Sequence, residues 1–219
     1  MDAEDISRWF LAAFFMGVAA FYTARILAAK SRTGRSPVFA GKPGTLHHLT
    51  HSTFRVFRAA ILIVCVLRVP WPAIDAALVP IHPFWRGEVI FSGLALMLAA
   101  FVGILFVHSY MGQDWRSGVP PERPVEAMRL ITSGPFALSR NPILLLVQLG
   151  QAGFFLALPT VFSLVCLIVG VTMVHAQVSV EEKEMAARFG ETWRAYARMT
   201  PRWLPLPGAP KQNTSHPIR

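Results

Sequence analysis

Charged residues are scarce in this chain of 219 residues, where Asp, Glu, Lys and Arg together make up 15%. Soluble globular domains carry about 25%, so the deficit excludes an ordinary soluble enzyme. A hydrophobic content of 53% excludes a disordered chain, which needs low hydrophobicity and high charge. The sequence has two cysteines, Cys65 and Cys166, and both lie in apolar runs. We therefore expect no disulfide framework and interpret both thiols as buried apolar side chains.

Acidic residues are especially few, with 12 Asp and Glu against 21 Lys and Arg, and the formal net charge is +9. In a soluble chain this excess would point to nucleic acid, but no nucleic-acid recognition motif is present. The basic residues stand between apolar runs instead, which is typical of a membrane protein in contact with anionic lipid. The sequence predicts membrane lipid as a partner, predicts no nucleic-acid partner and leaves the oligomeric state open.

Five apolar segments are predicted to cross a membrane, which takes about 20 residues. The first three are residues 9–29, 54–69 and 88–108. The last two come from one apolar run, residues 142–178, which is too long for one span and divides at Leu158-Pro159-Thr160. The predicted fold is an all-α integral membrane protein of five transmembrane helices, with a C-terminal helical hairpin formed by the last two.

The Lys and Arg residues divide unequally between the two sides of these spans. Eighteen fall on the side that holds the two long loops and the C-terminal segment, and three fall on the other side. The three are Arg8, Arg68 and Arg86. Because the basic loops of membrane proteins face the cytosol, we expect the N-terminus outside and the C-terminus in the cytosol.

A cytosolic helix is expected to follow the last span. Residues 180–199 are rich in helix formers and carry apolar residues at spacings of three and four, which we interpret as a packing stripe of a helix bent near Gly190. The members of the stripe include Met185, Phe189, Trp193 and Tyr196. We interpret residues 1–205 as a single membrane-embedded domain and residues 206–219 as a flexible tail.

The predicted hairpin brings together polar residues about forty positions apart. Arg140 precedes the fourth span, and Glu181 and Glu182 follow the fifth, so the cation and the carboxylates are expected to meet at the cytosolic face. Asn141 as N-cap and Pro142 as first helical residue favour a helix start there, whose free N–H groups and dipole suit an anion. The alternative interpretation is that Arg140 marks the topology and the glutamates solvate a helix end.

Four segments resemble the isoprenylcysteine carboxyl methyltransferase and phospholipid methyltransferase superfamily. Residues 131–142 (ITSGPFALSRNP) are similar to its Gly-Pro and Arg-His-Pro or Arg-Asn-Pro segment, and residues 181–196 resemble its Glu-Glu and Phe-Gly block, which closes in residues 200–205. Residues 111–116 (MGQDWR) are similar to a stretch that precedes the core in many bacterial members. The resemblance implies a bacterial inner-membrane protein.

Within the single domain, the resemblance implies a cofactor-binding core over residues 109–205, preceded by three spans in residues 1–108. It implies methyl transfer from S-adenosylmethionine to a lipophilic or membrane-partitioning acceptor at the cytosolic membrane face, with Arg140 and Glu182 as the catalytic residues. The implied cofactor-binding residues are Gly134, Pro135, Phe136, Arg140, Asn141, Pro142, Glu181 and Glu182. The candidate substrate contacts are Trp115, Arg116 and His175.

The nucleophile of the acceptor stays open between a carboxylate, a thiol and an amine. A carboxylate or thiolate needs no general base and would be placed by Arg140 or by helix dipoles. An amine must be neutral, which an apolar site favours, and the acidic pair would then suit a cationic head group. No metal is expected, because His47 and His51 share a helix face without further ligands nearby.

Two other functions are alternatives to methyl transfer. An NADPH-dependent membrane reductase of the sterol-reductase type has a similar C-terminal hairpin, but its HPNYxGE signature is absent here. A transporter or scaffold without catalysis is the second, and it is favoured by Leu144 and Leu146, which are aliphatic where the family often has an aromatic residue and a glycine.

Overall fold

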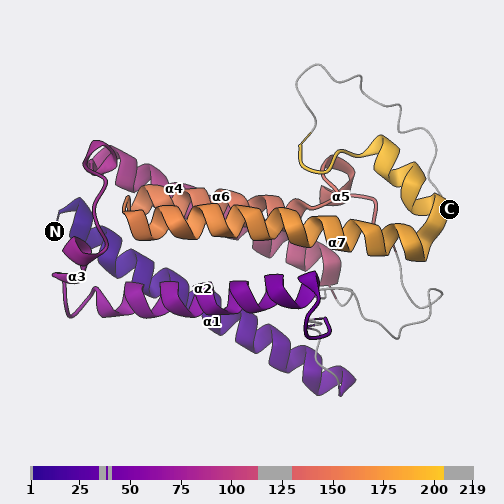
Figure 1. The fold of residues 1–219 in the computed structure, drawn as a ribbon, viewed down its shortest axis with the longest axis horizontal. Helices are drawn as coiled ribbons and strands as arrows, with labels where there is room; N and C mark the ends of the chain where they lie inside the picture. Colours follow the sequence, from indigo (N-terminus) through magenta and orange to yellow (C-terminus); the bar gives the residue numbers. More distant parts are fainter. Residues whose placement is uncertain (1, 35–37, 39–40, 113–129, 205–219) are drawn as a thin grey trace.

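The computed structural model describes residues 2–34, 38, 41–112 and 130–204. These residues form an all-helical bundle, and the part of the chain described contains no β-strand beyond an isolated bridge between Pro80 and Thr160. The elements in chain order are α1 (Ala3–Thr33), α2 (Leu46–Leu67), α3 (Ile74–Ala77), the 3-10 helix η1 (His82–Phe84), α4 (Gly87–Met111), α5 (Pro135–Leu138), α6 (Pro142–Ala157) and α7 (Val161–Met199) (Figure 1).

Four of these helices, α1, α2, α4 and α7, are long and apolar enough to cross a membrane, which confirms an integral membrane protein. The fourth predicted span corresponds to α6, which has 16 residues and is not one of these four helices. At 1.5 Å per residue this helix is about 24 Å long, less than the roughly 30 Å thickness of a hydrocarbon core. The break between α6 and α7 lies at residues 158–160, as the sequence predicts.

The second helix begins at Leu46, earlier than the predicted start at residue 54. The reason is a side-chain cap, because the hydroxyl of Thr45 accepts a hydrogen bond from the backbone N–H of His48. With this cap the helix includes two polar turns before the apolar segment. In these turns the rings of His47 and His51 stack, with centroids 4.7 Å apart. Helix α7 also begins at a capping box, formed by Thr160 and Ser163.

Helix α7 has 39 residues and continues past the membrane-spanning part of its sequence. Its apolar run ends at Val178, and 39 residues would extend about 58 Å. Gly190 has non-helical angles (φ 54°, ψ −124°), so the helix bends there, as predicted, and its last turns fold back toward α5 (Figure 1). A positive φ is a conformation that glycine adopts without steric cost.

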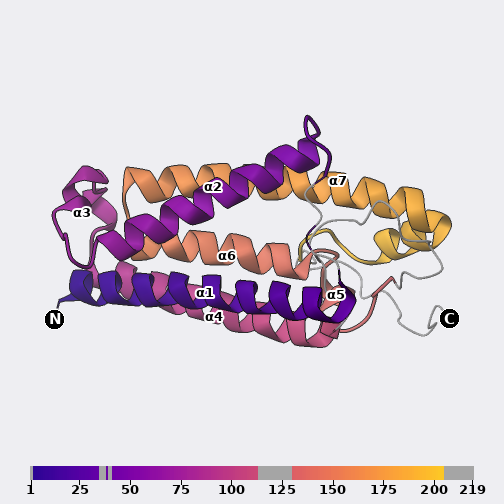
Figure 2. The ribbon, with the colours of Figure 1, turned by 90° about the horizontal axis from the view of Figure 1, so that it is seen from below.

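Helices α4 and α6 pack most closely (Figure 2). A Cβ atom at Gly93 would lie 2.3 Å from the backbone nitrogen of Ala157, and one at Gly153 would lie 2.9 Å from the carbonyl oxygen of Gly93. Small residues permit such close contact between helices in membranes. Beside this contact lies the core, which includes both free cysteines, Cys65 and Cys166, as buried side chains.

The bundle end that holds the N-terminus is closed by buried charges, and we call it the Asp75 end. The carboxylate of Asp75 accepts hydrogen bonds from Arg68 and, at 2.8 Å, from Arg8. Arg68 is 1% exposed. The indole of Trp85 donates to Glu4 at 2.5 Å, which ties η1 and its flank to α1. The other end, where α6 begins, is called the Arg140 end below.

Candidate active site at the Arg140 end

The segment before α6 is hydrogen-bonded to the segment that ends α7. The hydroxyl of Tyr196 donates to the carbonyl of Phe136 at 2.7 Å, and burial raises the pKa of this hydroxyl, which keeps it a donor. The hydroxyl of Ser139 donates to the carbonyl of Arg202 at 3.1 Å, and the backbone N–H of Arg140 donates to Pro201 at 2.9 Å. Two sequence segments about sixty residues apart therefore form one unit.

Arg140 is the centre of this unit, and its guanidinium donates four hydrogen bonds. Two go to the carboxylate of Glu182, at 3.1 and 3.2 Å. The other two go to the backbone carbonyls of Ala197 at 2.9 Å and Thr200 at 2.7 Å. Since a guanidinium has five N–H donors, one remains for other contacts. The geometry makes Arg140 chiefly a residue that positions α7 against α6.

Glu182 accepts hydrogen bonds from three side chains and is 12% exposed. Besides Arg140, they are the amide of Asn141 at 3.1 Å and the guanidinium of Arg202 at 2.8 and 3.2 Å. Burial acts to raise the pKa of the Glu182 carboxyl, but the hydrogen bonds from Arg140 and Arg202 outweigh burial and hold this pKa below its ordinary value. The predicted meeting of Arg140 with Glu182 is confirmed, and the carboxylate is ionised at neutral pH.

Asn141 is the N-cap residue of α6, but its side chain does not cap the helix. Its amide group is taken by Glu182, and its own backbone N–H donates to the hydroxyl of Ser139 at 3.1 Å. Glu181 has a separate contact, because it accepts a hydrogen bond from Gln177 at 2.8 Å. Among the described hydrogen bonds, the two glutamates therefore have different partners.

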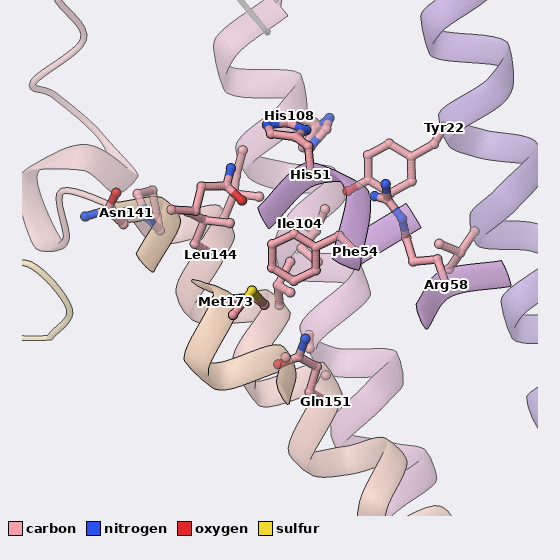
Figure 3. Close-up of a pocket in the computed structure, with 18 of the residues that line it drawn as sticks. Tyr22, His51, Phe54, Arg58, Ile104, His108, Asn141, Leu144, Gln151 and Met173 are labelled. Carbon is pink, nitrogen blue, oxygen red and sulfur yellow. The ribbon is translucent and has the colours of Figure 1, made fainter. Parts of the chain in front are cut away.

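A chamber of about 840 Å³ opens beside this network and extends between α1, α2, α4, α6 and α7 (Figure 3). Six of the predicted cofactor residues line it, namely Phe136, Arg140, Asn141, Pro142, Glu181 and Glu182. The stripe of α7 that the sequence analysis interprets as packing also lines it, through Met185, Phe189, Trp193 and Tyr196. The stripe therefore lines the chamber in addition to packing against other parts of the protein.

Other predicted site residues lie elsewhere. Gly134 and Pro135 are outside the chamber lining, and Gly134, at φ 59°, passes so close to Tyr110 that a Cβ would lie 2.5 Å from its ring. His175 is exposed and its ring lies 5.1 Å from that of Trp203, away from the chamber. The candidates Trp115 and Arg116 fall outside the described residues.

Sequence reasoning missed several residues that the structure brings to the site. Arg202 lies in the segment 200–205 that resembles the family, but its contact with Glu182 is not predicted from the sequence. Tyr22, His51 and Arg58 line the chamber from α1 and α2. For Tyr22 and Arg58 the signal is an ionisable residue within a predicted span, since such residues are functional candidates. His51 precedes the predicted span, and from the sequence it is considered only as a metal ligand.

Comparison with protein families gives a match. Residues 89–192 match the family model described as phospholipid methyltransferase. The matched segment runs from α4 to α7 and includes Arg140 and Glu182. No curated protein and no solved structure matches the chain. The order of the motifs and the apolar helices agree with this match, and residues 89–192 are a phospholipid methyltransferase domain of the isoprenylcysteine and phospholipid methyltransferase superfamily.

Proposed function

We propose that this protein transfers a methyl group from S-adenosylmethionine to a lipophilic acceptor at the cytosolic membrane face. The observation that carries the proposal is the contact between the two segments that resemble the family, residues 131–142 and 181–196. Arg140 donates to Glu182 and so joins the start of α6 to α7 beside the chamber. The family match supports a methyltransferase, because its members are methyltransferases.

The residues at the Arg140 end fit S-adenosylmethionine. Its amino acid part carries an ammonium and a carboxylate. The chamber wall offers the carboxylate of Glu181 to the ammonium and the remaining N–H donor of Arg140 to the carboxylate. Its adenine would lie against an aromatic ring, and Trp193 and Phe136 supply such rings at the same wall. When bound, the cofactor supplies a methyl group on a sulfonium sulfur, which moves to the acceptor as the carbon–sulfur bond breaks.

The protein's own contribution is binding and orientation. Arg140 and Glu182 hold α6, α7 and the turn at residues 200–202 in one arrangement, so the chamber wall is fixed before either reactant binds. The apolar lining excludes water from the acceptor. Holding a nucleophile in line with a methyl group lowers the barrier by up to about 7–11 kcal/mol, so no general base is required when the nucleophile is already ionised.

The proposed topology has five spans, with α6 and α7 as the C-terminal hairpin and the Arg140 end in the cytosol. In support, α6 and α7 lie side by side in both views (Figures 1 and 2), and they are in contact. The three Lys and Arg residues assigned to the outside, Arg8, Arg68 and Arg86, all belong to the Asp75 end or its flank. The short α6 would cross with its ends extended by polar flanking residues or with local thinning of the bilayer.

The test is binding of S-adenosylmethionine to the detergent-purified chain. We expect saturable binding by the wild type and a loss of at least tenfold in affinity for Glu182→Gln and Arg140→Gln, each of which breaks the network. Glu191→Gln is the matched control, because Glu191 is an exposed carboxylate on the same helix, paired with Arg198. NADPH is the comparison ligand. Wild-type protein that is monodisperse and binds no S-adenosylmethionine contradicts the proposal.

Methyl transfer itself is then measured with a radiolabelled methyl donor and total lipid extract. Counts in the lipid fraction that require wild-type protein and disappear with Glu182→Gln support the proposal. Binding without transfer to any lipophilic fraction would restrict it to cofactor binding and contradict the proposed enzyme.

A further inference from the structure

The chamber has a second polar wall, away from the Arg140 network. Figure 3 shows Asn141 on one side, and Tyr22 and Arg58 on the other. Between these two walls most of the lining side chains are apolar, and His108 and Gln151 are polar exceptions (Figure 3). The apolar lining includes Phe14, Val18, Phe54, Ile104, Leu144 and Met173. The residues of the second wall come from α1 and α2, outside the segment that matches the family.

His51 is the buried polar group of this wall. It lies on α2, lines the chamber and is 8% exposed, and its Nε2 atom is buried without a hydrogen-bond partner among the described residues. A buried polar atom without a partner costs free energy unless a ligand or water satisfies it. Its ring stacks on that of His47, which fixes its orientation. The unsatisfied nitrogen is therefore a hydrogen-bonding position for a molecule in the chamber.

Arg58 is the charged group of the same wall. It lies two turns after His51 on α2, and its side chain points toward Tyr22 (Figure 3). Within the described residues, no carboxylate pairs with its guanidinium, and the groups that act on it electrostatically are Tyr22 and Arg55. Arg55 also lines the chamber. Arg58 is exposed and lines the chamber. An arginine within a span normally pairs with an acidic group, and the described residues of this wall supply none.

The charges of the other wall do not supply that anion. Among the described lining residues, the carboxylates are Glu181 and Glu182, both on α7. Glu182 is held by Arg140, Asn141 and Arg202, and Glu181 accepts from Gln177. The α1 and α2 wall is cationic and carries hydrogen-bond donors, while the surface between the walls is mostly apolar.

We propose that α1 and α2 build an anion-binding subsite into the chamber, in which Arg58 pairs with the anionic group of a lipophilic molecule, His51 and Tyr22 hydrogen-bond to it, and the apolar lining holds its chain. The subsite selects against amphiphiles with a cationic head group. The assignment of this molecule as the methyl acceptor rests on the proposed function. Binding of the molecule to the subsite does not rest on that function, because binding needs no cofactor.

The test measures binding of single-chain amphiphiles by native mass spectrometry of the full chain in a neutral maltoside detergent, without S-adenosylmethionine. The anionic probes are dodecanoate and dodecyl phosphate, and they distinguish a carboxylate from a phosphate head group. Dodecylamine and dodecanol carry the same chain with a cationic and a neutral head. We expect the wild type to bind at least one anionic probe at least tenfold more tightly than the amine or the alcohol.

Variants assign the binding to this wall. Arg58→Gln is expected to weaken anion binding about tenfold or more, since hydrogen bonds to charged groups contribute about 1.5–3 kcal/mol, and to leave dodecanol binding unchanged. Arg58→Lys keeps the charge and most of the preference. Lys30→Gln is the matched control, because it also removes one positive charge. Lys30 is exposed near the C-terminal end of α1 and lies outside the chamber lining.

Equal binding of anionic, neutral and cationic probes overturns the subsite, as does an anion preference that survives Arg58→Gln in monodisperse protein. Binding of S-adenosylmethionine is measured on the same samples to separate the two proposals. Anion binding without cofactor binding overturns the proposed function and leaves the subsite, whereas cofactor binding without anion preference overturns the subsite alone.

Discussion

At the scale of single residues, Glu182 concentrates the interactions of the Arg140 end on one carboxylate. It accepts from Arg140, Asn141 and Arg202, so its loss leaves a guanidinium with a buried, unpaired face. Charge-assisted hydrogen bonds of this kind are stronger than neutral ones. The same contacts that favour the ionised form lower its pKa, and stability is thereby linked to pH.

We predict that Glu182→Gln lowers the free energy of unfolding at neutral pH by about 2 kcal/mol, the contribution of hydrogen bonds to a charged group. Because the folded-state pKa is depressed, this contribution is present above the unfolded-state pKa of about 4.3 and is lost as the pH falls through the folded-state value. Thermal unfolding in detergent as a function of pH measures it, and the curves of wild type and variant should converge in acid.

The control for this comparison is Glu191→Gln. Glu191 is exposed and pairs with Arg194 and Arg198 on the surface of α7, where salt bridges contribute little. We expect no measurable change in stability. A constant difference between wild type and Glu182→Gln at every pH would contradict the role given to the ionised carboxylate.

At the scale of elements, local sequence signals set where the helices begin and bend, and glycines allow the closest contacts between helices. Thr45, Thr160 and Ser163 set helix starts, and Gly190 sets the bend of α7. Helices α4 and α6 approach at Gly93 and Gly153. Within lipid, apolar surface alone gives helices little reason to associate, so packing at small residues decides which helices touch.

We predict that Gly93→Ala destabilises the protein by about 1–3 kcal/mol, the usual cost of overpacking a tight core. The added Cβ would lie 2.3 Å from the backbone of Ala157, so α4 and α6 must separate. Gly17→Ala is the matched control, since nothing lies within 4 Å of a Cβ there, and it is expected to be neutral or to stabilise α1. Unfolding in detergent by heat measures both, and equal effects would contradict the packing argument.

At the scale of the whole molecule, the bundle has two unlike ends joined by apolar helices. The Asp75 end holds a buried charge cluster that ties α1, the end of α2 and the segment around α3 together. The Arg140 end joins α6 to α7 and opens into the chamber. The five longer helices all contribute to the chamber wall, so its shape depends on how every one of them is placed.

We predict that Asp75→Asn destabilises the whole bundle by about 3–5 kcal/mol, because it leaves the buried Arg68 and the largely buried Arg8 without their shared carboxylate. Glu88→Gln removes an exposed carboxylate near the same end and is the control. Thermal unfolding in detergent measures the difference. If Asp75→Asn unfolds at the wild-type temperature, the charge cluster does not hold this end together.

The proposed orientation predicts which end reacts with a membrane-impermeant thiol reagent in intact cells. Arg86→Cys should react directly, whereas Lys30→Cys should react after the membrane is made permeable. The unsubstituted chain is the background, because Cys65 and Cys166 are buried. The reverse pattern would contradict the orientation derived from the Lys and Arg distribution.

The sequence by itself determined the membrane class, the positions of most helices and the meeting of Arg140 with Glu182. Long apolar runs can be identified without knowing what they pack against. When the chain crosses a membrane and returns, the start of the first span and the end of the second lie on the same side. The break at residues 158–160 and the bend at Gly190 were likewise local signals.

Only the tertiary structure decided which sides of the helices face the chamber. Along an apolar span the side against lipid is as hydrophobic as the side against protein, so the sequence pattern carries little information about which residues point inward. For this reason the sequence does not predict that Tyr22, His51 and Arg58 line the chamber, or that the stripe of α7 faces it. Contacts between distant segments, such as Arg202 with Glu182, depend on the bend that returns the chain to α6.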